Sequence, residues 1–258
     1  VNPPANITIT CAAAETYAPP NLNYSNSATA ACLISGTATP VITRNYTSCG
    51  GDMTITWSYN VDCWTDSYSQ TITVQPAPQP SFVNPPANIT ITCAQALTFT
   101  APNLNYTNAL AGQCLVSGST PAALDPDFDE CGGTITVTWD QPLTCGGNII
   151  HTQTVAVQPA PLPAWVNPPA NTTITCAQAE VFNPADLNYS NAASGSCLIA
   201  GSASGVVVSS YSECGGTITV TYSAVDNCNR PLPNHVQTVT VQPAPLPAWV
   251  NPPANQTI

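Results

Sequence analysis

Twelve cysteines fall in one spacing that is repeated three times along this chain of 258 residues. The three sets begin at Cys11, Cys93 and Cys176, and within each set the successive cysteines are 21, 17 and 14 residues apart. Self-similarity at a fixed period is the sequence signature of a repeat architecture. The chain is therefore expected to fold as a series of similar units, each with its own four cysteines.

A hexapeptide, Val-Asn-Pro-Pro-Ala-Asn, marks the start of each unit. It begins at Val1, Val83, Val166 and Val250, at spacings of 82, 83 and 84 residues. Length variation is confined to the loop after the fourth cysteine, because the next hexapeptide always begins 13 positions after the glutamine of the last strand. The predicted domains are residues 1–82 (repeat 1), 83–165 (repeat 2) and 166–249 (repeat 3), and residues 250–258 are expected to begin a fourth repeat of a continuous covalent array.

Alternating apolar and polar residues predict short β-strands in every repeat. The first strand is expected over Asn6 to Cys11, with Ile7, Ile9 and Cys11 on one face, and the pattern contains no convincing helix. Period-2 alternation with turn residues between the runs indicates an all-β fold of tandem immunoglobulin-like antiparallel β-sandwiches with about seven strands each. Aromatic residues in the buried phase of the long strand are expected in the core: Trp57, Trp139 and Tyr222.

The charge balance excludes several partners. Charged residues make up 6% of the chain, Arg44 and Arg230 are its only basic residues apart from histidine, and the net charge is −11. Nucleic acids and anionic membrane surfaces are bound through Lys and Arg, so neither is an expected partner. No apolar run approaches the 18 residues of a membrane-spanning helix, so no direct membrane insertion is expected in this segment.

Two disulfides per repeat are predicted, because a unit of this size buries little surface and gains from cross-links. The expected strand directions place the first and third cysteines at one end of a repeat and the second and fourth at the other. The third and fourth cysteines bracket an extended stretch of about 45 Å, too long for a bond between them. The predicted pairs are Cys11–Cys49, Cys32–Cys63, Cys93–Cys131, Cys114–Cys145, Cys176–Cys214 and Cys197–Cys228.

Three runs of repeat 3, residues 214–220, 225–228 and 237–241, resemble the hyalin-repeat (HYR-like) domain in the four-cysteine variant of large surface proteins of Bacteroidota-type bacteria. The resemblance extends over all three repeats. It implies an immunoglobulin-like sandwich, an extracellular location and a role in adhesion or surface fibres. The linker of residues 157–165 departs from the family pattern, because it lacks the acidic residues often found there.

Metal and catalytic readings find little support. Zinc is disfavoured, since no Cys-x-x-Cys pair exists. Asp125, Asp127 and Asp129 have alternate spacing that could suit calcium, but no glycine turn or distal glutamate follows, and a solvated loop is the preferred interpretation. His151 and His235 are expected in exposed loops without a nucleophile. No metal, no cofactor and no enzymatic activity are predicted.

The proline-rich joint between repeats carries one aromatic residue each time, at Phe82, Trp165 and Trp249. Proline fixes φ and favours extended geometry, so the joint is expected to be stiff. Trp165 is predicted to contact a neighbouring domain, with sugar stacking as the alternative role for these rings.

Eight Asn-x-Ser/Thr sequons are candidate glycosylation sites. They lie at Asn6, Asn23, Asn45, Asn88, Asn105, Asn171, Asn188 and Asn255.

Together these features predict an extracellular protein, secreted or at the cell surface, whose function is structural or adhesive. The preferred hypothesis is a stiff stalk or filament, with neighbouring repeats of the same chain, and other copies in a fibre, as partners. The alternative is a glycan- or protein-binding module that uses the variable loop between the fourth cysteine and the last strand. Cysteine-rich frames of this kind indicate an oxidising compartment.

Overall fold

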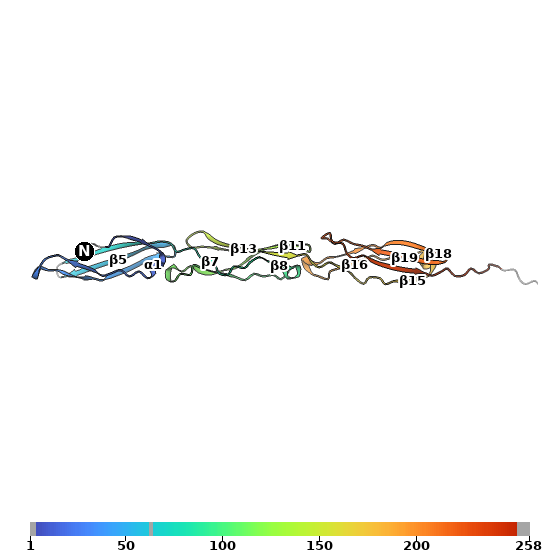
Figure 1. Cartoon of the computed structure of the whole chain (residues 1–258), viewed down its shortest axis with the longest axis horizontal. Coiled ribbons are helices and arrows are strands. Elements are labelled where there is room, and N and C mark those ends of the chain that lie inside the picture. The colour runs from blue at the N-terminus through green and yellow to red at the C-terminus, as the bar shows by residue number, and fades with distance from the viewer. Residues whose placement is uncertain (1–3, 62–63, 252–258) are drawn as a thin grey trace, which may run out of the picture. The chain divides into compact units, whose positions relative to one another are not determined.

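The fold is all-β, and the computed structural model describes residues 4–61 and 64–251 (Figure 1). By its internal contacts the chain forms two compact units, and the middle repeat contributes segments to both. Unit 1 comprises residues 1–87, 100–125 and 136–154, and unit 2 comprises residues 88–99, 126–135 and 155–258.

Repeat 1 contains a four-stranded sheet in the order β1-β6-β5-β4. The strands β4, β5 and β6 are antiparallel, whereas β1 pairs in parallel with β6, with Ile7 opposite Ile72. The prediction of a wholly antiparallel sandwich is therefore wrong for the first strand. The bounds are β1 (Ile7–Ile9), β4 (Pro40–Thr47), β5 (Gly50–Val61) and β6 (Trp64–Val74).

The core of repeat 1 lies between this sheet and a second, two-stranded sheet formed by β2 (Leu22–Ser25) and β3 (Ser35–Ala38). Ile55 and Trp57 of β5 are buried, and Leu22 of β2 packs against them in the same cluster. The Trp57 indole donates a hydrogen bond to the Pro20 carbonyl at 2.9 Å. This satisfies its polar atom inside the core, as burial of a polar group requires.

Repeats 2 and 3 each form one three-stranded and one four-stranded sheet, and each takes its first strand, β7 or β14, from the two residues before its predicted boundary. The sheet orders are β10-β9-β7 and β11-β12-β13-β8 in repeat 2, and β14-β16-β17 and β15-β20-β19-β18 in repeat 3. The strands of repeat 2 are β7 (Ser81–Phe82), β8 (Ile89–Thr92), β9 (Leu104–Thr107), β10 (Ser117–Thr120), β11 (Ala123–Asp129), β12 (Gly132–Pro142) and β13 (Asn148–Gln158). Those of repeat 3 are β14 (Ala164–Trp165), β15 (Thr172–Ile174), β16 (Leu187–Ser190), β17 (Ala200–Ala203), β18 (Val206–Ser212), β19 (Gly215–Tyr222) and β20 (His235–Val241).

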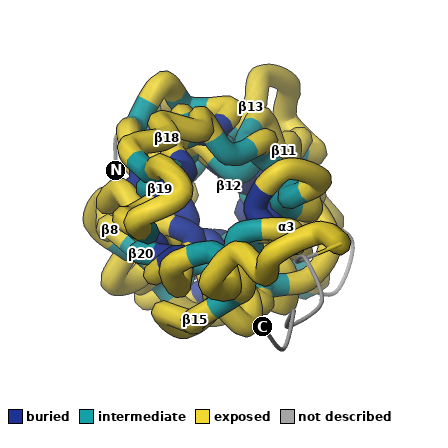
Figure 2. Tube along the Cα trace, turned by 90° about the vertical axis from the view of Figure 1, so that its right-hand side faces the viewer, coloured by how far each residue is buried: buried dark blue, intermediate teal, exposed yellow. Residues whose placement is uncertain are grey.

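The two sheets of repeat 3 enclose a core of their own. Ile218, Val220 and Tyr222 of β19 pack with Val239 of β20 and with Leu187 of the facing sheet. Figure 2 shows the buried stretches of β19 and β20 turned inward, with exposed backbone around them. Seven strands in two facing sheets form the immunoglobulin-like sandwich that the alternation predicted. Burial of Trp57, Trp139 and Tyr222 confirms the predicted core positions.

Short helices follow the first strand of every repeat, where the sequence pattern predicted none. They are α1 (Cys11–Glu15), α2 (Cys93–Ala96) and α3 (Cys176–Ala179), so each first cysteine begins a helix and does not extend the strand. A threonine caps each helix, and Gln95 and Gln178 complete reciprocal capping boxes in α2 and α3. The Thr-Cys-Ala-Gln sequence is the signal that could have predicted α2 and α3. None of the described helices is long and apolar enough to cross a bilayer.

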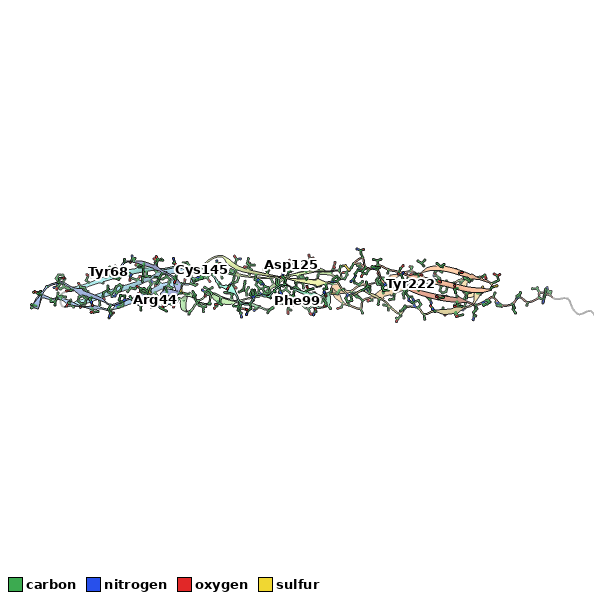
Figure 3. The ribbon with its side chains drawn as sticks, viewed as in Figure 1. Arg44, Tyr68, Phe99, Asp125, Cys145 and Tyr222 are labelled. Carbon is green, nitrogen blue, oxygen red and sulfur yellow. A yellow bond between two sulfur atoms is a disulfide. The ribbon has the colours of Figure 1, made fainter. Side chains whose placement is uncertain are left out.

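The two histidines lie on the last strands of their repeats and not in exposed loops, so that expectation is wrong. Nε2 of His151 is 3.0 Å from the Pro86 carbonyl, and Nε2 of His235 is 3.0 Å from that of Pro169. In repeat 1, Tyr68 (labelled in Figure 3) takes the same place, and its hydroxyl donates to the Pro4 carbonyl at 2.7 Å. These rings hold the start of each repeat against its last strand.

Candidate functional site at the disulfide junctions

Four disulfides among the described residues connect successive repeats. We call the place where two such bonds join one repeat to the next a junction. The first cysteine of one repeat bonds to the second cysteine of the next, and the third bonds to the fourth. Each bond encloses 96 to 104 residues of chain. Within unit 1 the bonds are Cys11–Cys114 and Cys49–Cys145, and within unit 2 they are Cys93–Cys197 and Cys131–Cys228.

The predicted pairing within repeats is therefore wrong. Cys11 Sγ lies 3.7 Å from the Thr47 carbonyl, so Cys11 and Cys49 do lie near one another, but each bonds to repeat 2. A disulfide needs Cα atoms within about 7 Å, and the observed pairs are 5.1 to 5.8 Å apart. The pairs that the structure replaces are Cys11–Cys49, Cys93–Cys131, Cys114–Cys145 and Cys197–Cys228.

Three cysteines are unpaired in the described part of the chain. Cys176 and Cys214 of repeat 3 do not bond to one another, contrary to the prediction. Cys32 is exposed and unpaired, and its predicted partner Cys63 lies outside the described residues.

In unit 1, the bond between the first and second cysteines joins α1 to the 3-10 turn of Gly112–Cys114. Cys11 and Cys114 are both buried, and Cys114 belongs to the core cluster of repeat 1. The Glu15 carboxylate accepts a hydrogen bond from the Gln113 backbone N–H at 2.8 Å. Gly112 has a φ of +61° and lies against Glu15, so a Cβ at this position would displace the Glu15 carboxylate. The turn is thus shaped to receive the helix of the preceding repeat.

The linker of unit 1 is anchored beside the second bond. The Ala77 N–H donates to the Ser48 carbonyl at 2.8 Å, immediately before Cys49. The Ser48 hydroxyl lies 3.8 Å from Cys145 Sγ (labelled in Figure 3). The proline-rich segment therefore lies alongside the junction and contacts it. A flexible tether would make no such contacts.

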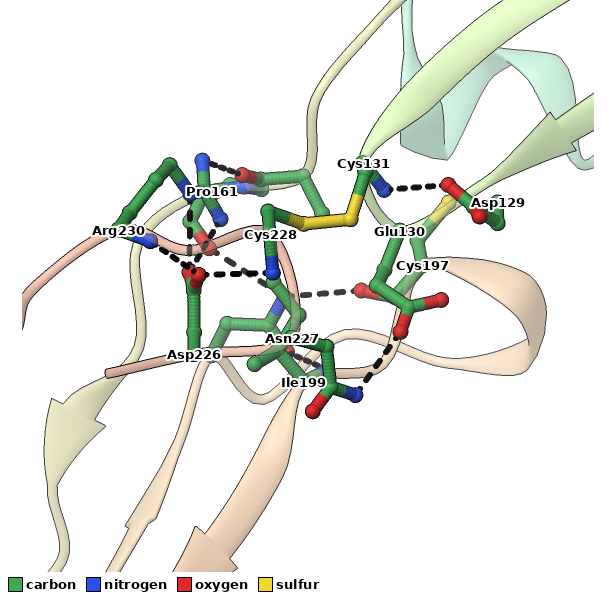
Figure 4. A network of polar contacts seen from close by, with 12 residues as sticks. Asp129, Glu130, Cys131, Pro161, Cys197, Ile199, Asp226, Asn227, Cys228 and Arg230 are labelled. Atoms are coloured by element: carbon green, nitrogen blue, oxygen red, sulfur yellow. Dashed lines mark hydrogen bonds and ion pairs between the residues drawn. A yellow bond between two sulfur atoms is a disulfide. The ribbon is translucent and has the colours of Figure 1, made fainter. Parts of the chain in front are cut away.

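The corresponding junction of unit 2 adds a polar network around Cys131–Cys228 (Figure 4). The Ala160 N–H of the linker donates to the Glu130 carbonyl at 2.9 Å, and Asn227 Nδ2 donates to the Glu130 carboxylate at 2.9 Å. The Asn227 hydrogen bond is the main cause that lowers the pKa of Glu130. Glu130 therefore stays ionised as it bridges the two repeats.

An ion pair between Asp226 and Arg230 completes this network. The Asp226 side chain is fully buried and accepts from the backbone N–H groups of Cys228 and Arg230, each at 2.9 Å. Burial would raise the pKa of Asp226, but the hydrogen bonds from Arg230, its charge and the Cys228 N–H together lower it. Nε and Nη2 of Arg230 contact Asp226, and Nη1 donates to the Ala160 carbonyl at 2.8 Å. Arg230 thus attaches the variable loop of repeat 3 to the linker.

The aromatic residues of the joint pack on the repeat that follows them. Phe82 in β7 pairs with Tyr106 of β9, and Trp165 in β14 pairs with Tyr189 of β16. The Trp165 indole donates to the Pro233 carbonyl at 2.7 Å and meets Tyr189 edge-on. Trp249, at the equivalent place after repeat 3, is 92% exposed.

The acidic residues considered for calcium lie on strand β11. Asp125 (Figure 3), Asp127 and Asp129 are exposed, and Asp129 accepts from the Cys131 N–H at 2.7 Å. Alternate residues of a strand are about 7 Å apart, which spreads the three carboxylates. Across residues 4–61 and 64–251, no group of three or more His, Cys, Asp or Glu is arranged to hold a metal ion.

The sequon asparagines other than Asn255, which lies outside the described residues, are all exposed. Some have side chains with structural partners: the Asn6 carbonyl accepts from the Thr71 N–H at 2.9 Å, and that of Asn171 from the Thr238 N–H at 2.8 Å. Their modification remains a prediction.

Comparisons with known proteins leave the family open, since no protein-family model and no curated protein matches the chain. Solved structures with some likeness include domains EC1–3 of mouse protocadherin-24, at 8% identity and a TM-score of 0.28, covering 75% of this chain and 80% of that one. Titin domains I67–I69 match at 9% identity and a TM-score of 0.25, covering 92% of this chain and 95% of that one. These scores are too low to support an argument about fold family or function.

Proposed function

We propose that this chain is a structural segment of an extracellular stalk or filament, formed from HYR-like repeats that are covalently tied to their neighbours. The observation that carries the proposal is that two disulfides cross each junction. Disulfides persist in oxidising environments outside the cytosol. A pair of bonds at separate points of one junction restricts both bending and twisting, which is the mechanical requirement of a stiff stalk.

The linker contacts support the same function. Backbone hydrogen bonds from Ala77 and Ala160 attach the linker to the residue before each third cysteine. Phe82 and Trp165 attach its far end to the next sandwich through β7 and β14. Because both ends of this proline-rich segment are held and proline fixes φ, the segment acts as a rigid spacer and not as a flexible tether.

The alternative of a binding module needs variable loops that are available to a ligand. In repeat 3 that loop is engaged at the junction, because Arg230 donates to the Ala160 carbonyl. This contact favours the structural function, and the proposal includes no ligand, cofactor or catalytic activity. Fibre formation with other copies remains part of the proposal.

Pulling single molecules from their two ends tests the mechanical function. Under oxidising conditions the disulfides provide a covalent path from Cys11 to Cys114 and from Cys131 to Cys228, so the intervening segments cannot extend. We expect the released contour length to be much shorter than in reductant. A variant with Cys11, Cys49, Cys93 and Cys131 replaced by Ala is the control and should extend fully in both conditions. Equal lengths for the oxidised and reduced wild-type chain would refute the proposal.

A further inference from the structure

The two disulfides of one junction differ in their exposure to solvent. In unit 1, Cys11 is 1% and Cys114 0% exposed, and both belong to the core cluster of repeat 1. Cys49 and Cys145, which form the second bond, are exposed. A thiolate in solution reaches an exposed disulfide directly, whereas a buried disulfide reacts only after local unfolding. The exposed bond is therefore the reactive one of the pair.

The junction of unit 2 shows the same division. Cys93 and Cys197 are buried, whereas Cys131 is exposed and Cys228 is half-buried. Because one buried and one exposed bond occur at both junctions, a difference in reactivity between the two exposed bonds must arise from their neighbouring residues.

Those neighbouring residues differ in charge. Thr47 and Ser48 precede the exposed bond of unit 1, and the Thr47 hydroxyl accepts from the Cys49 N–H at 3.1 Å. Asp129 and Glu130 take the same two places in unit 2, and the Asp129 carboxylate accepts from the N–H of the third cysteine of repeat 2 at 2.7 Å. Two carboxylates repel an approaching thiolate, and two hydroxyls do not. The exposed bond of unit 1 therefore admits an anionic nucleophile more readily than that of unit 2.

A groove of about 190 Å³ reaches the exposed bond of unit 1. Among the described residues that line it, which include Ser48 and Cys145, none is charged. The Ser48 hydroxyl lies 3.8 Å from Cys145 Sγ, and because a disulfide sulfur carries no proton, the hydroxyl is the donor. A hydrogen bond to this sulfur stabilises the Cys145 thiolate when the disulfide breaks, and a stabilised leaving thiolate speeds the exchange.

We propose that the Cys49–Cys145 disulfide is a thiol–disulfide exchange site for a low-molecular-weight thiol, and that its reduction converts the junction of unit 1 from two bonds to one. The buried Cys11–Cys114 bond keeps the repeats joined after the exposed bond opens. Residues 143–146 are then released from the linker that shares the groove with them. The exchange site rests on the surroundings of the bond alone. Its consequence, a stalk that loosens in thiol without separating, rests on the proposed function.

The reaction consists of two successive exchanges. The thiolate of the small molecule attacks Cys49 Sγ, the sulfur–sulfur bond of the protein breaks, and Cys145 leaves as a thiolate and is protonated. A second small thiolate attacks the small-molecule sulfur of the mixed disulfide and releases Cys49, which is protonated in turn. The two protein sulfurs gain two electrons and two protons, and the two small thiols supply them as they become one disulfide.

Differential alkylation of the full chain tests the site. Free thiols are first blocked with N-ethylmaleimide, the chain is treated with reduced glutathione, and the new thiols are labelled with a second reagent and mapped by mass spectrometry. We expect Cys49 and Cys145 to be labelled first, Cys131 and Cys228 about tenfold more slowly because of the adjacent carboxylates, and the buried pairs about a hundredfold more slowly. The mixed disulfide with glutathione should be on Cys49. Labelling of any other pair before Cys49 and Cys145, or at the same rate, would overturn the proposal.

Reciprocal substitutions separate the effect of charge from that of exposure. Thr47→Asp with Ser48→Glu should slow the opening of the exposed bond of unit 1 about tenfold, and Asp129→Thr with Glu130→Ser should speed that of unit 2 by a similar factor. Both effects should shrink at high salt, which screens exposed charges. Thr43→Asp is the control, because it adds a charge about 13 Å further along β4, and it should leave the rate unchanged. An intact Cys11–Cys114 peptide in each digest identifies a folded variant, and rates that do not respond to the reciprocal charges would contradict the assigned order of reactivity.

Amide hydrogen exchange tests the loosening, after the exposed bond has been opened and alkylated. The Ala77 N–H, which donates to the Ser48 carbonyl beside the groove, should exchange about tenfold faster than in the oxidised chain. The Gln113 N–H, which donates to Glu15 beside the buried bond, should be unaffected. Unchanged exchange at Ala77 would refute the loosening. Pulling the fully oxidised chain does not depend on this result, so a stalk that never loosens and a chain that is no stalk give different outcomes.

Discussion

At the scale of single residues, the junction of unit 2 depends on one buried carboxylate. Asp226 accepts hydrogen bonds from Arg230 and Cys228, and Arg230 carries the contact onward to the linker at Ala160. Arg230 is one of two arginines in a chain without lysine. The sequence assigned this residue a place in the charge balance but no structural role, because it lies in the loop of variable length and its linker partner, Ala160, is 70 residues away.

Asp226→Asn should destabilise the chain near neutral pH by about 1–3 kcal/mol, the usual cost of losing hydrogen bonds to a charged group. Because folding lowers the pKa of Asp226, its stabilisation is present above the ordinary carboxyl pKa of about 4 and disappears as the pH falls through the lowered folded value. Denaturant unfolding of both proteins across this range should therefore show the difference shrinking in acid. Asp125→Asn, at an exposed strand position, is the control, and a difference independent of pH would contradict the assignment.

At the scale of elements, each junction depends on a short helix fitting against a 3-10 turn. The capping threonine starts the helix at the first cysteine, so this cysteine belongs to the helix and not to the preceding strand. The receiving turn begins at a residue with positive φ, which is Gly112 in repeat 2, Gly195 in repeat 3 and Ala30 in repeat 1. Glycine adopts this conformation at little cost, and at position 112 it also leaves room for Glu15.

Gly112→Ala should lower the free energy of unfolding by about 1–3 kcal/mol, from backbone strain and from the contact of the new Cβ with Glu15. Gly146→Ala is a control for glycine replacement in a turn, because Gly146 has a φ of +92° but nothing within 4 Å of its Cβ position. The two glycines differ in φ, so the contact is isolated by a double-mutant cycle: in a Glu15→Ala background, Gly112→Ala should cost only the backbone strain. An unchanged cost in that background would show that the turn does not depend on its fit to α1.

At the scale of the whole molecule, the disulfides make the repeats covalently interdependent. In the entropic model, a disulfide that closes a loop of about 100 residues lowers the conformational entropy of the unfolded chain and so stabilises the folded state by roughly 4–5 kcal/mol. Each of the four bonds encloses a loop of this size. Pairing within repeats would enclose loops less than half as long. The junctions thus contribute stability that an isolated repeat could not obtain from its own cysteines.

A protease site inserted between Pro161 and Leu162 tests this connectivity directly. After cleavage we expect a single species of about 27 kDa on electrophoresis without reductant, and two fragments once the disulfides are reduced. A cleaved variant with Cys93 and Cys131 replaced by Ala should separate into fragments in either condition. Separation of the wild-type fragments without reductant would mean that the cysteines pair within repeats.

The sequence by itself determined which face of the long strands is buried in this protein. Alternation along single strands identified the buried phase, so Trp57, Trp139 and Tyr222 were placed in the core correctly. Tertiary structure alone decided which cysteines pair. In a repeated sequence, bonding Cys11 to Cys49 of its own repeat or to Cys114 of the next is compatible with the same cysteine spacing. The choice depends on which thiol the capped helix and the anchored linker bring within bonding distance, and that arises from contacts between residues about 100 positions apart.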